Sequence, residues 1–395
     1  MPVSSARSRC RLHGRFRSTR SFRHRESGPH RLRECKWART AEIKIQPDWT
    51  SGVYVGKLSC SGHRYESYII FVVRDDRKAD LLFQTSDTTW QAYNKWPDEY
   101  SLYNTDLPNR PWNASTWISY DRPYGWYPQV VSNPLSQGSG EFLLWEYPLC
   151  FWLEQHGYDV SYISNIDTHV DRAGLARVKC FLSVAHDEYW SLEMHDNIQS
   201  AVQAGLSVAF LCGNSVSGVI PLEKLNSEGR PHRLIYRTGM FGGANTNNAT
   251  EAWEKHGPDE ALLVGARTMS PANGSGNWTV TKAEHWIFEG TGMKNGDAFL
   301  GLVGWEHHGA PEPLTGLEVI AAGKTLQPAG RLQFTPQMVH LTLTRKSPNF
   351  GNFATCAQTT AGRSAFVSTS YKSIRGNQPV DFSLWFSGMI MQTPE

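Results

Sequence analysis

Polar residues that could do catalysis or bind a metal follow four apolar segments of this 395-residue chain. Each segment is short, apolar and bounded by turn residues, which is typical of a buried strand. The segments and the residues after them are 80–84 with Asp87, Trp90, Gln91, Tyr93 and Asn94; 158–164 with Asp167 and His169; 179–184 with His186, Asp187 and Glu188; and 206–211 with Cys212, Gly213, Asn214 and Ser215. In an open parallel sheet, ligands bind at the carboxyl ends of the strands. The sequence therefore predicts one site built from four strand ends.

Oxygen donors dominate the candidate residues. The phenols and carboxylates that could serve a site are Tyr93, Tyr103, Tyr124, Glu188, Glu289 and Glu306, with His186 and Asn214 nearby. Phenolate and carboxylate are hard anionic donors that suit Fe(III) better than zinc. Structural explanations remain open, because most of the 15 tyrosines are expected to be half-buried aromatics with bonded hydroxyls. Glu188 could equally be an acid at a helix N-terminus, just before Ser191.

Common catalytic motifs are absent or incomplete. The sequence has no HExxH, GxGxxG or Walker A motif, and the HxE element at His186 and Glu188 lacks the PCxxC half of a zinc deaminase. The run GNSVSG misses the GxSxG nucleophile motif by one position. Cys212 could be a thiol nucleophile at a strand end, although a cysteine within AFLC is more typical of a core.

Helical patterns lie between the strand-like segments. Ser191 is expected to cap a helix over LEMHDNIQSAVQAG, which stops at Gly205. The stretch Glu141–His156 is also helical in pattern, and Pro148 should kink it or mark its true start. Strand, helix and strand over 179–211 make a βαβ unit, which implies parallel pairing.

The second half of the chain reads differently. Beyond residue 220, glycine, asparagine and proline separate shorter strand-like runs such as 317–322 and 338–343. The fold class is therefore α/β, with a β-rich elaboration after the main sheet.

Composition and charge exclude several classes of protein. With 40% hydrophobic and 12% aromatic residues the chain is not globally disordered, and it has no apolar run of eighteen residues that would span a membrane. Residues 1–40 hold 12 basic and two acidic residues, so the other 355 carry a net charge of −8. The body therefore has no electrostatic reason to bind nucleic acid. Residues 1–40 lack apolar periodicity and are expected to be a disordered, dispensable basic leader.

The cysteines indicate a reducing compartment. They number seven, are widely spaced and include no CxxC pair, which is poor material for a disulfide framework. Cys150, Cys180 and Cys212 lie inside apolar runs and are expected to be small buried hydrophobes. We therefore expect a cytoplasmic protein.

Seven longer motifs point to a known family: DLLFQTSDTTWQAYNKWP, SYDRPYGWY, EFLLWEYPLCFWLEQHGYDVSYISNID, FLSVAHDEYWS, AGLSVAFLCGNS, HWIFEGTG and LVGWEHHG. Together they resemble the C-terminal catalytic domain of the large (beta) subunit of N,N-dimethylformamidase. The resemblance covers residues 48–345, whereas residues 1–40 and 346–395 match it poorly. It implies a glutamine-amidotransferase-like (flavodoxin-like) parallel sheet with helices on both faces.

The resemblance also implies an activity and a cofactor. The activity is hydrolysis of a formamide-type C–N bond, and the cofactor is one Fe(III) ion held by two tyrosines and one glutamate. The glutamate ligand falls on Glu188 of HDEYW. The tyrosine ligands fall on Tyr93 of TWQAYN and Tyr124 of DRPYG, with Tyr103 as a rival.

Three further residues are carried over by motif. His186 of HDEYW is a catalytic neighbour of the metal, and Asn214 of CGNS polarises the substrate or orients water. A later catalytic glutamate falls on Glu306 of GWEHH, with Glu289 of FEGTG as second choice.

The expected partners are a small amide substrate, a small partner subunit and further copies of the same chain. An aromatic wall from Trp90, Trp96 or Trp126 would suit a small, weakly polar amide. Two alternatives stay open: a catalytically inactive binding module on the same fold, which would lack metal, and a thiol amidase using Cys212, which alkylation would abolish.

Overall fold

The structure is a computed structural model. It describes residues 30–39, 41–59, 62, 66–97, 100–104, 116–125, 136–242, 256–268, 275–303, 308–326, 338–343 and 363–366.

Four parallel strands form the centre of the fold. They are β3 (Ala79–Thr85), β5 (Val160–Ser164), β6 (Val178–Ala185) and β8 (Ser207–Cys212), in the spatial order β8-β6-β3-β5. All four lie within two residues of the segments expected from sequence. Their apolar runs are buried because a parallel sheet is covered on both faces.

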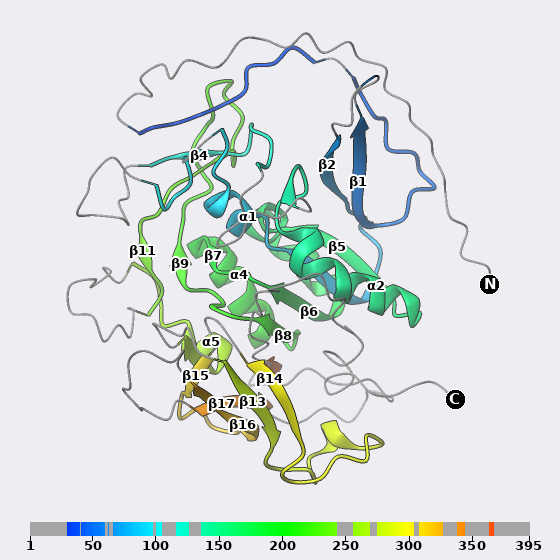
Figure 1. The fold of residues 1–395 in the computed structure, drawn as a ribbon, viewed down its shortest axis with the longest axis vertical. Coiled ribbons are helices and arrows are strands. Elements are labelled where there is room, and N and C mark those ends of the chain that lie inside the picture. The colour runs from blue at the N-terminus through cyan, green and yellow to red at the C-terminus, as the bar shows by residue number, and fades with distance from the viewer. Residues whose placement is uncertain are drawn as a thin grey trace.

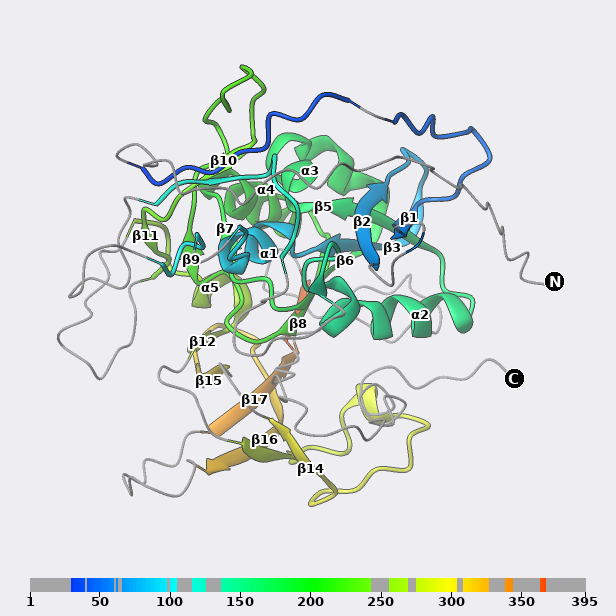
Figure 2. The ribbon, with the colours of Figure 1, turned by 45° about the horizontal axis from the view of Figure 1, so that its top comes forward.

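Helices cover both faces of this sheet. Because side chains alternate along a strand, Phe83 of β3 packs in one buried cluster with α2 (Tyr147–Gln155), and its neighbour Leu82 packs in another with α4 (Leu192–Gln203). Figure 2 shows α2 on one side of the strands, and α3 (Asn165–Val170) and α4 on the other. The α/β class and the two helical layers are confirmed.

An antiparallel extension continues the same sheet, as the β-rich second half indicated. Its strands are β13 (Ser275–Val280), β14 (Ala298–Val303), β16 (Val319–Leu326), β17 (Met338–Leu343) and β18 (Arg363–Phe366), in the order β14-β13-β16-β17-β18. β18 runs antiparallel to β17 and parallel to β8, so it joins the two parts. Figure 1 draws the extension below the parallel strands.

Smaller sheets and helices complete the described fold. The small sheets are the hairpin β1 (Gly52–Ser59) with β2 (Glu66–Val73); β4 (Ile118–Ser119) with β10 (Leu234–Ile235); β7 (Tyr189–Trp190), β9 (Gly218–Val219) and β11 (Gly239–Met240); and β12 (Ala266–Thr268) with β15 (His308–Pro311). The remaining helices are α1 (Asp87–Tyr93), α5 (Ala261–Val264), the π-helix η2 (Phe142–Glu146) and the 3-10 helices η3 (Arg172–Arg177) and η4 (Trp286–Phe288).

Two helix boundaries follow the sequence signals. The Ser191 hydroxyl accepts a 3.1 Å hydrogen bond from the backbone N–H of Met194, so it caps α4 as expected, and Gly205 (φ +107°) follows the end of that helix. The stretch Glu141–His156 divides into η2 and α2, and Pro148 lies in the first turn of α2. Pro148 therefore marks a true helix start, because proline is tolerated there.

The end of the basic leader contacts the folded part of the chain. The ring of His30 stacks on Trp117 with centroids 4.0 Å apart, and the Cys35 N–H donates to the Asp121 carbonyl at 2.7 Å. Residues 1–29 lie outside the described residues, as does segment 346–395 except for β18.

The cysteines differ in one respect from the expectation. Cys150 and Cys212 are free and buried, as expected, whereas Cys180 is buried but disulfide-bonded. Within the described residues, no helix is both long and apolar enough to cross a membrane.

Candidate active site

Helix α1 links the ends of strands β3 and β6. It begins two residues after β3, and its Thr89 hydroxyl accepts hydrogen bonds from the N–H groups of Glu188 (3.0 Å) and Tyr189 (3.2 Å). The neighbouring Thr88 hydroxyl donates to the Tyr189 carbonyl at 2.6 Å. The first turns of α1 therefore hold the HDEYW segment, and the last residue of α1 is Tyr93.

Two phenols and one carboxylate meet at this point. The Tyr93 hydroxyl donates to Oε2 of Glu188 at 2.7 Å, and the Tyr103 hydroxyl donates to the Tyr93 hydroxyl at 2.5 Å. The Tyr103 oxygen also lies 3.3 Å from both carboxylate oxygens of Glu188. The two tyrosine rings stack with centroids 4.4 Å apart. The structure thus brings Tyr93 and Glu188 together as expected, and the third member is Tyr103, the rival candidate.

Further aromatic and basic groups surround this cluster. The Tyr103 hydroxyl also contacts the hydroxyl of Tyr189. The buried guanidinium of Arg237 lies over the rings of Tyr103 and Tyr189, at 4.7 and 5.0 Å from their centroids. A cation over an aromatic face is attracted by the ring quadrupole, so Arg237 stabilises the packing of both rings.

His186 lies between two glutamates. Its Nε2 is 3.4 Å from Oε2 of Glu188, and its Nδ1 is 3.8 Å from Oε2 of Glu141. All three side chains are buried, and the imidazole ring is 5.4 Å from the ring of Tyr93. Ala185, just before His186, has φ +66°, a left-handed conformation that is uncommon outside glycine and often found at functional sites.

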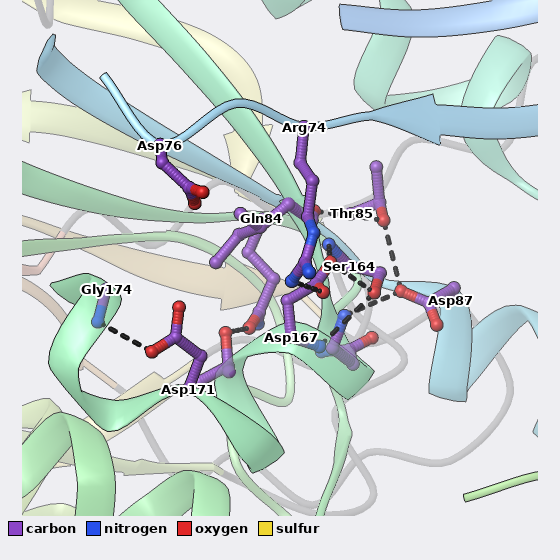
Figure 3. A network of polar contacts seen from close by, with 12 residues as sticks. Arg74, Asp76, Gln84, Thr85, Asp87, Ser164, Asp167, Asp171 and Gly174 are labelled. Carbon is purple, nitrogen blue, oxygen red and sulfur yellow. Dashed lines mark hydrogen bonds and ion pairs between the residues drawn. The ribbon is translucent and has the colours of Figure 1, made fainter. Parts of the chain in front are cut away.

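A network of buried polar side chains holds the HDEYW segment in place. Asp187 accepts hydrogen bonds from Gln84 (2.6 Å), Ser183 (2.8 Å) and Asn165 (3.1 Å). Asp87 accepts a hydrogen bond from the hydroxyl of Thr85 at 3.0 Å (Figure 3). It also accepts from the N–H of Asn165 at 2.7 Å and from the hydroxyl of Tyr120 at 3.0 Å. These bonds join the ends of β3, β5 and β6 into one rigid unit.

Burial changes the proton affinity of several carboxyls in this region. It raises the pKa of Asp87 and of Asp187 to about 6 each, although the hydrogen bonds that these carboxylates accept lower it. It also raises the pKa of Glu146 well above its usual range, although Oε1 of Glu146 accepts from the indole of Trp90 at 2.7 Å. Burial therefore makes these carboxyls easier to protonate than exposed ones.

Other polar residues after the strands have structural roles. Asp167 forms a capping box with Ser164 and an ion pair with Arg74 at 2.6 Å (Figure 3). His169 lies 2.7 Å from the Ser191 hydroxyl that caps α4.

Asn214 lies at the end of the neighbouring strand. Ala185 and Cys212 are paired in the sheet and are the last residues of β6 and β8. The two strands therefore end at the same level, and Glu188 and Asn214 both follow the carboxyl end of the sheet. The N–H groups of Val216 and Ser217 donate to the carbonyls of Asp187 and Glu188 at 3.1 and 2.9 Å. Asn214 and Val216 have φ +52° and +54°, so this loop too is held in a strained conformation.

Tyr124 lies elsewhere. Its ring packs edge-on to Trp90, with the ring centroids 6.0 Å apart. Burial raises its pKa. Trp90 itself is core, and Trp96 lies edge-on to Trp37.

The late glutamates do not join the cluster in the described part of the chain. Glu289 is exposed at the end of η4, and Glu306 lies outside the described residues, as does Trp126.

The donor set of the cluster fits a hard trivalent ion. Tyr93, Tyr103 and Glu188 place oxygen atoms 2.5 to 3.3 Å apart, and the shared protons between them are those that a cation would replace. Deprotonated, the three groups carry about three negative charges, which suits Fe(III). No group of three or more His, Cys, Asp or Glu among the described residues is arranged to hold a metal, and a site with two phenolates would not be of that kind.

Several residues of this region were not singled out by sequence. Glu141 looked like ordinary helix sequence, Tyr189 lay in HDEYW without an assigned role, and Arg237 lay in no quoted motif. Their contacts depend on chain segments that only the fold brings together. Tyr103 was already among the oxygen donors singled out from sequence, as a rival to Tyr124.

The fold and the site define the class of protein: an α/β protein with an oxygen-rich site at the carboxyl ends of a parallel sheet. Comparison with protein families then identifies it further. A model described as N,N-dimethylformamidase beta subunit-like, C-terminal, matches residues 5–371. The chain belongs to this family, as its motifs indicated, and the match extends beyond residues 48–345 at both ends. The curated proteins contain no match to this chain.

Proposed function

We propose that this protein is a hydrolase that cleaves the C–N bond of a small amide of the formamide type, with Fe(III) held by Tyr93, Tyr103 and Glu188. The observation that carries the proposal is the convergence of these three oxygen donors at the strand ends. The family name points to the same chemistry.

Bound there, Fe(III) would supply Lewis-acid polarisation of the amide carbonyl and acidify a water molecule. The chain's own residues would orient the substrate and transfer protons. His186, with Nε2 beside Glu188, is placed to accept a proton from water as its oxygen attacks the carbonyl carbon, and to return it to the leaving amine nitrogen when the C–N bond breaks. The Glu141 carboxylate lies near the other ring nitrogen, Nδ1, where it would stabilise the protonated imidazole.

Asn214 would donate its amide N–H to the developing oxyanion, since it lies at the same sheet edge as Glu188. Glu306 remains a proposed second proton carrier on the motif alone. The glutamine-amidotransferase-like topology belongs to the same proposal, supported by four parallel strands with helices on both faces.

A thiol amidase is the weaker candidate. Cys212 is fully buried, and burial, together with nearby Asp187, raises its pKa to about 12. A thiol with so high a pKa is almost entirely protonated at neutral pH and is a poor nucleophile. Cys212→Ala is therefore expected to keep the amidase activity.

The test is iron content, visible absorbance and hydrolysis of a panel of short formamides and amides, measured on the wild type and Glu188→Ala. Iron bound by phenolates absorbs visible light, so the wild type should be coloured and active and the variant pale and inactive while still folded. A wild type that binds no iron and cleaves no amide would favour the inactive binding module. Retained iron and activity in the variant would refute the ligand assignment.

Association is part of the proposal too. The family name includes a beta subunit, which supports a partner subunit, and we propose self-association as well. Cytoplasmic residence also stays a proposal. Sedimentation of the protein purified from its native cells, with and without added salt, tests both kinds of association.

A further inference from the structure

The segment SYDRPYG contributes a buried arginine that binds the main chain close to both tyrosines in sequence. Arg122 donates from Nη2 to the Gln91 carbonyl at 2.8 Å and from Nη1 to the carbonyls of Trp96 and Tyr100 at 3.0 Å each. Its Nε also donates to the Gln91 side chain at 3.2 Å. The side chain is 6% exposed, so these carbonyls are its environment.

The carbonyls belong to the two segments that carry Tyr93 and Tyr103. Gln91 lies in the last turn of α1, two residues before Tyr93, and Tyr100 lies three residues before Tyr103. One further bond, from the Leu102 N–H to the Ala92 carbonyl at 2.9 Å, joins the same two segments. One guanidinium and this backbone hydrogen bond therefore tie together the two segments that carry the phenols.

The chemistry of arginine suits this position. Its planar fork offers five donors, so one side chain can reach three carbonyls at fixed angles, whereas lysine is a point charge on a flexible stem. Burial lowers the pKa of Arg122 to about 9, which still leaves it charged at neutral pH. A cation also interacts favourably with the open carbonyls at the C-terminus of α1.

We propose that Arg122 is a positioning residue that fixes the stacked Tyr93–Tyr103 pair by binding the main chain on both sides of it. The segment SYDRPYG therefore serves the site through Arg122, while Tyr124 packs against Trp90. The positioning of the two phenols by Arg122 is inferred from the geometry alone. Only the expected effect on iron binding rests on the proposed function.

Photo-oxidative cross-linking of the metal-free protein tests the positioning. Two stacked tyrosines can couple to dityrosine, and mass spectrometry identifies the Tyr93–Tyr103 product among other products. Arg122→Met is expected to lower its yield several-fold, and Arg122→Lys, which keeps the charge and the fold with less disturbance, to lower it less. Arg233→Lys is the matched control, because Arg233 binds the adjacent Asp121 and should leave the yield unchanged.

Iron affinity is the second readout. Supporting residues around a metal site typically contribute 10–100-fold in affinity, so folded Arg122→Lys should bind iron about that much more weakly than Arg233→Lys. Unchanged cross-linking in either folded Arg122 variant would overturn the inference. Cross-linking that depends on Arg122 in a wild type that binds no iron would uphold it and refute only the proposed function.

Discussion

The hydroxyl of Tyr93 donates a 2.7 Å hydrogen bond to Oε2 of Glu188, across 95 residues of sequence. Two strands and one short helix bring these atoms together: α1 follows β3, the HDEYW segment follows β6, and Thr89 of α1 holds the backbone of Glu188. Because the parallel strands end at the same level, the side chains that follow them meet. The proposed chemistry therefore depends on the geometry of one end of the sheet.

The histidine between two glutamates predicts a selective loss of turnover. His186→Asn should lower kcat by about 10²–10⁴, the usual contribution of a general acid–base group, and keep bound iron. Glu141→Gln should lower kcat by about tenfold, because it removes only the charge beside Nδ1. His169→Asn is the control: it removes another buried histidine, one that contacts the Ser191 cap, and should reduce stability without changing kcat. Equal kcat in His186→Asn and the wild type would show that this histidine does not take part in the reaction.

Asp87 predicts how stability depends on pH. Its pKa rises from 3.8 to about 6 on folding, so the folded state binds the extra proton between those pH values. This contribution to stability is complete below about pH 4 and is lost as the pH rises through about 6. Asp87→Asn should remove this loss of stability with rising pH, because an amide does not ionise. At pH 7 the variant should be more stable than the wild type by about 2 kcal/mol, since its amide can still bond Asn165 and Tyr120.

Urea unfolding at about pH 4 and pH 7 measures this difference. Asp76→Asn is the control, because the side chain of Asp76 is 85% exposed and should not alter the slope. If Asp87→Asn lost stability equally at both pH values, its hydrogen bonds would matter more than its charge.

The two parts of the basic leader are predicted to differ in how much they contribute to stability. Deleting residues 1–29 should leave the melting temperature unchanged, as expected from their lack of apolar periodicity. Deleting residues 1–40 should lower stability by about 1–2 kcal/mol, because it removes the His30–Trp117 stack and the 2.8 Å bond from Arg33 to the Tyr100 hydroxyl. Identical melting of the two deletions would mean that residues 30–39 contribute nothing.

Sequence predicted the strands well, because buried parallel strands are continuous apolar runs with clear ends. It also placed Ser191 as a helix cap, since capping is a local property. The motifs favoured Tyr124 over Tyr103 as the second tyrosine, because sequence does not show how the segments after α1 pack. Nor could it find Glu141, whose neighbour His186 comes from a strand 45 residues away.

Replacing each of the two competing tyrosines by phenylalanine tests the central claim most directly. Iron per protein and visible absorbance would be measured on Tyr103→Phe and Tyr124→Phe, which lose one hydroxyl each and keep the ring. The geometry predicts that Tyr103→Phe loses the colour and most of the iron, because its oxygen lies 3.3 Å from both oxygens of Glu188. Tyr124→Phe should keep both, since its ring packs against Trp90 and not in the stacked Tyr93–Tyr103 pair. Loss of iron and colour in Tyr124→Phe, with both retained in Tyr103→Phe, would contradict the account.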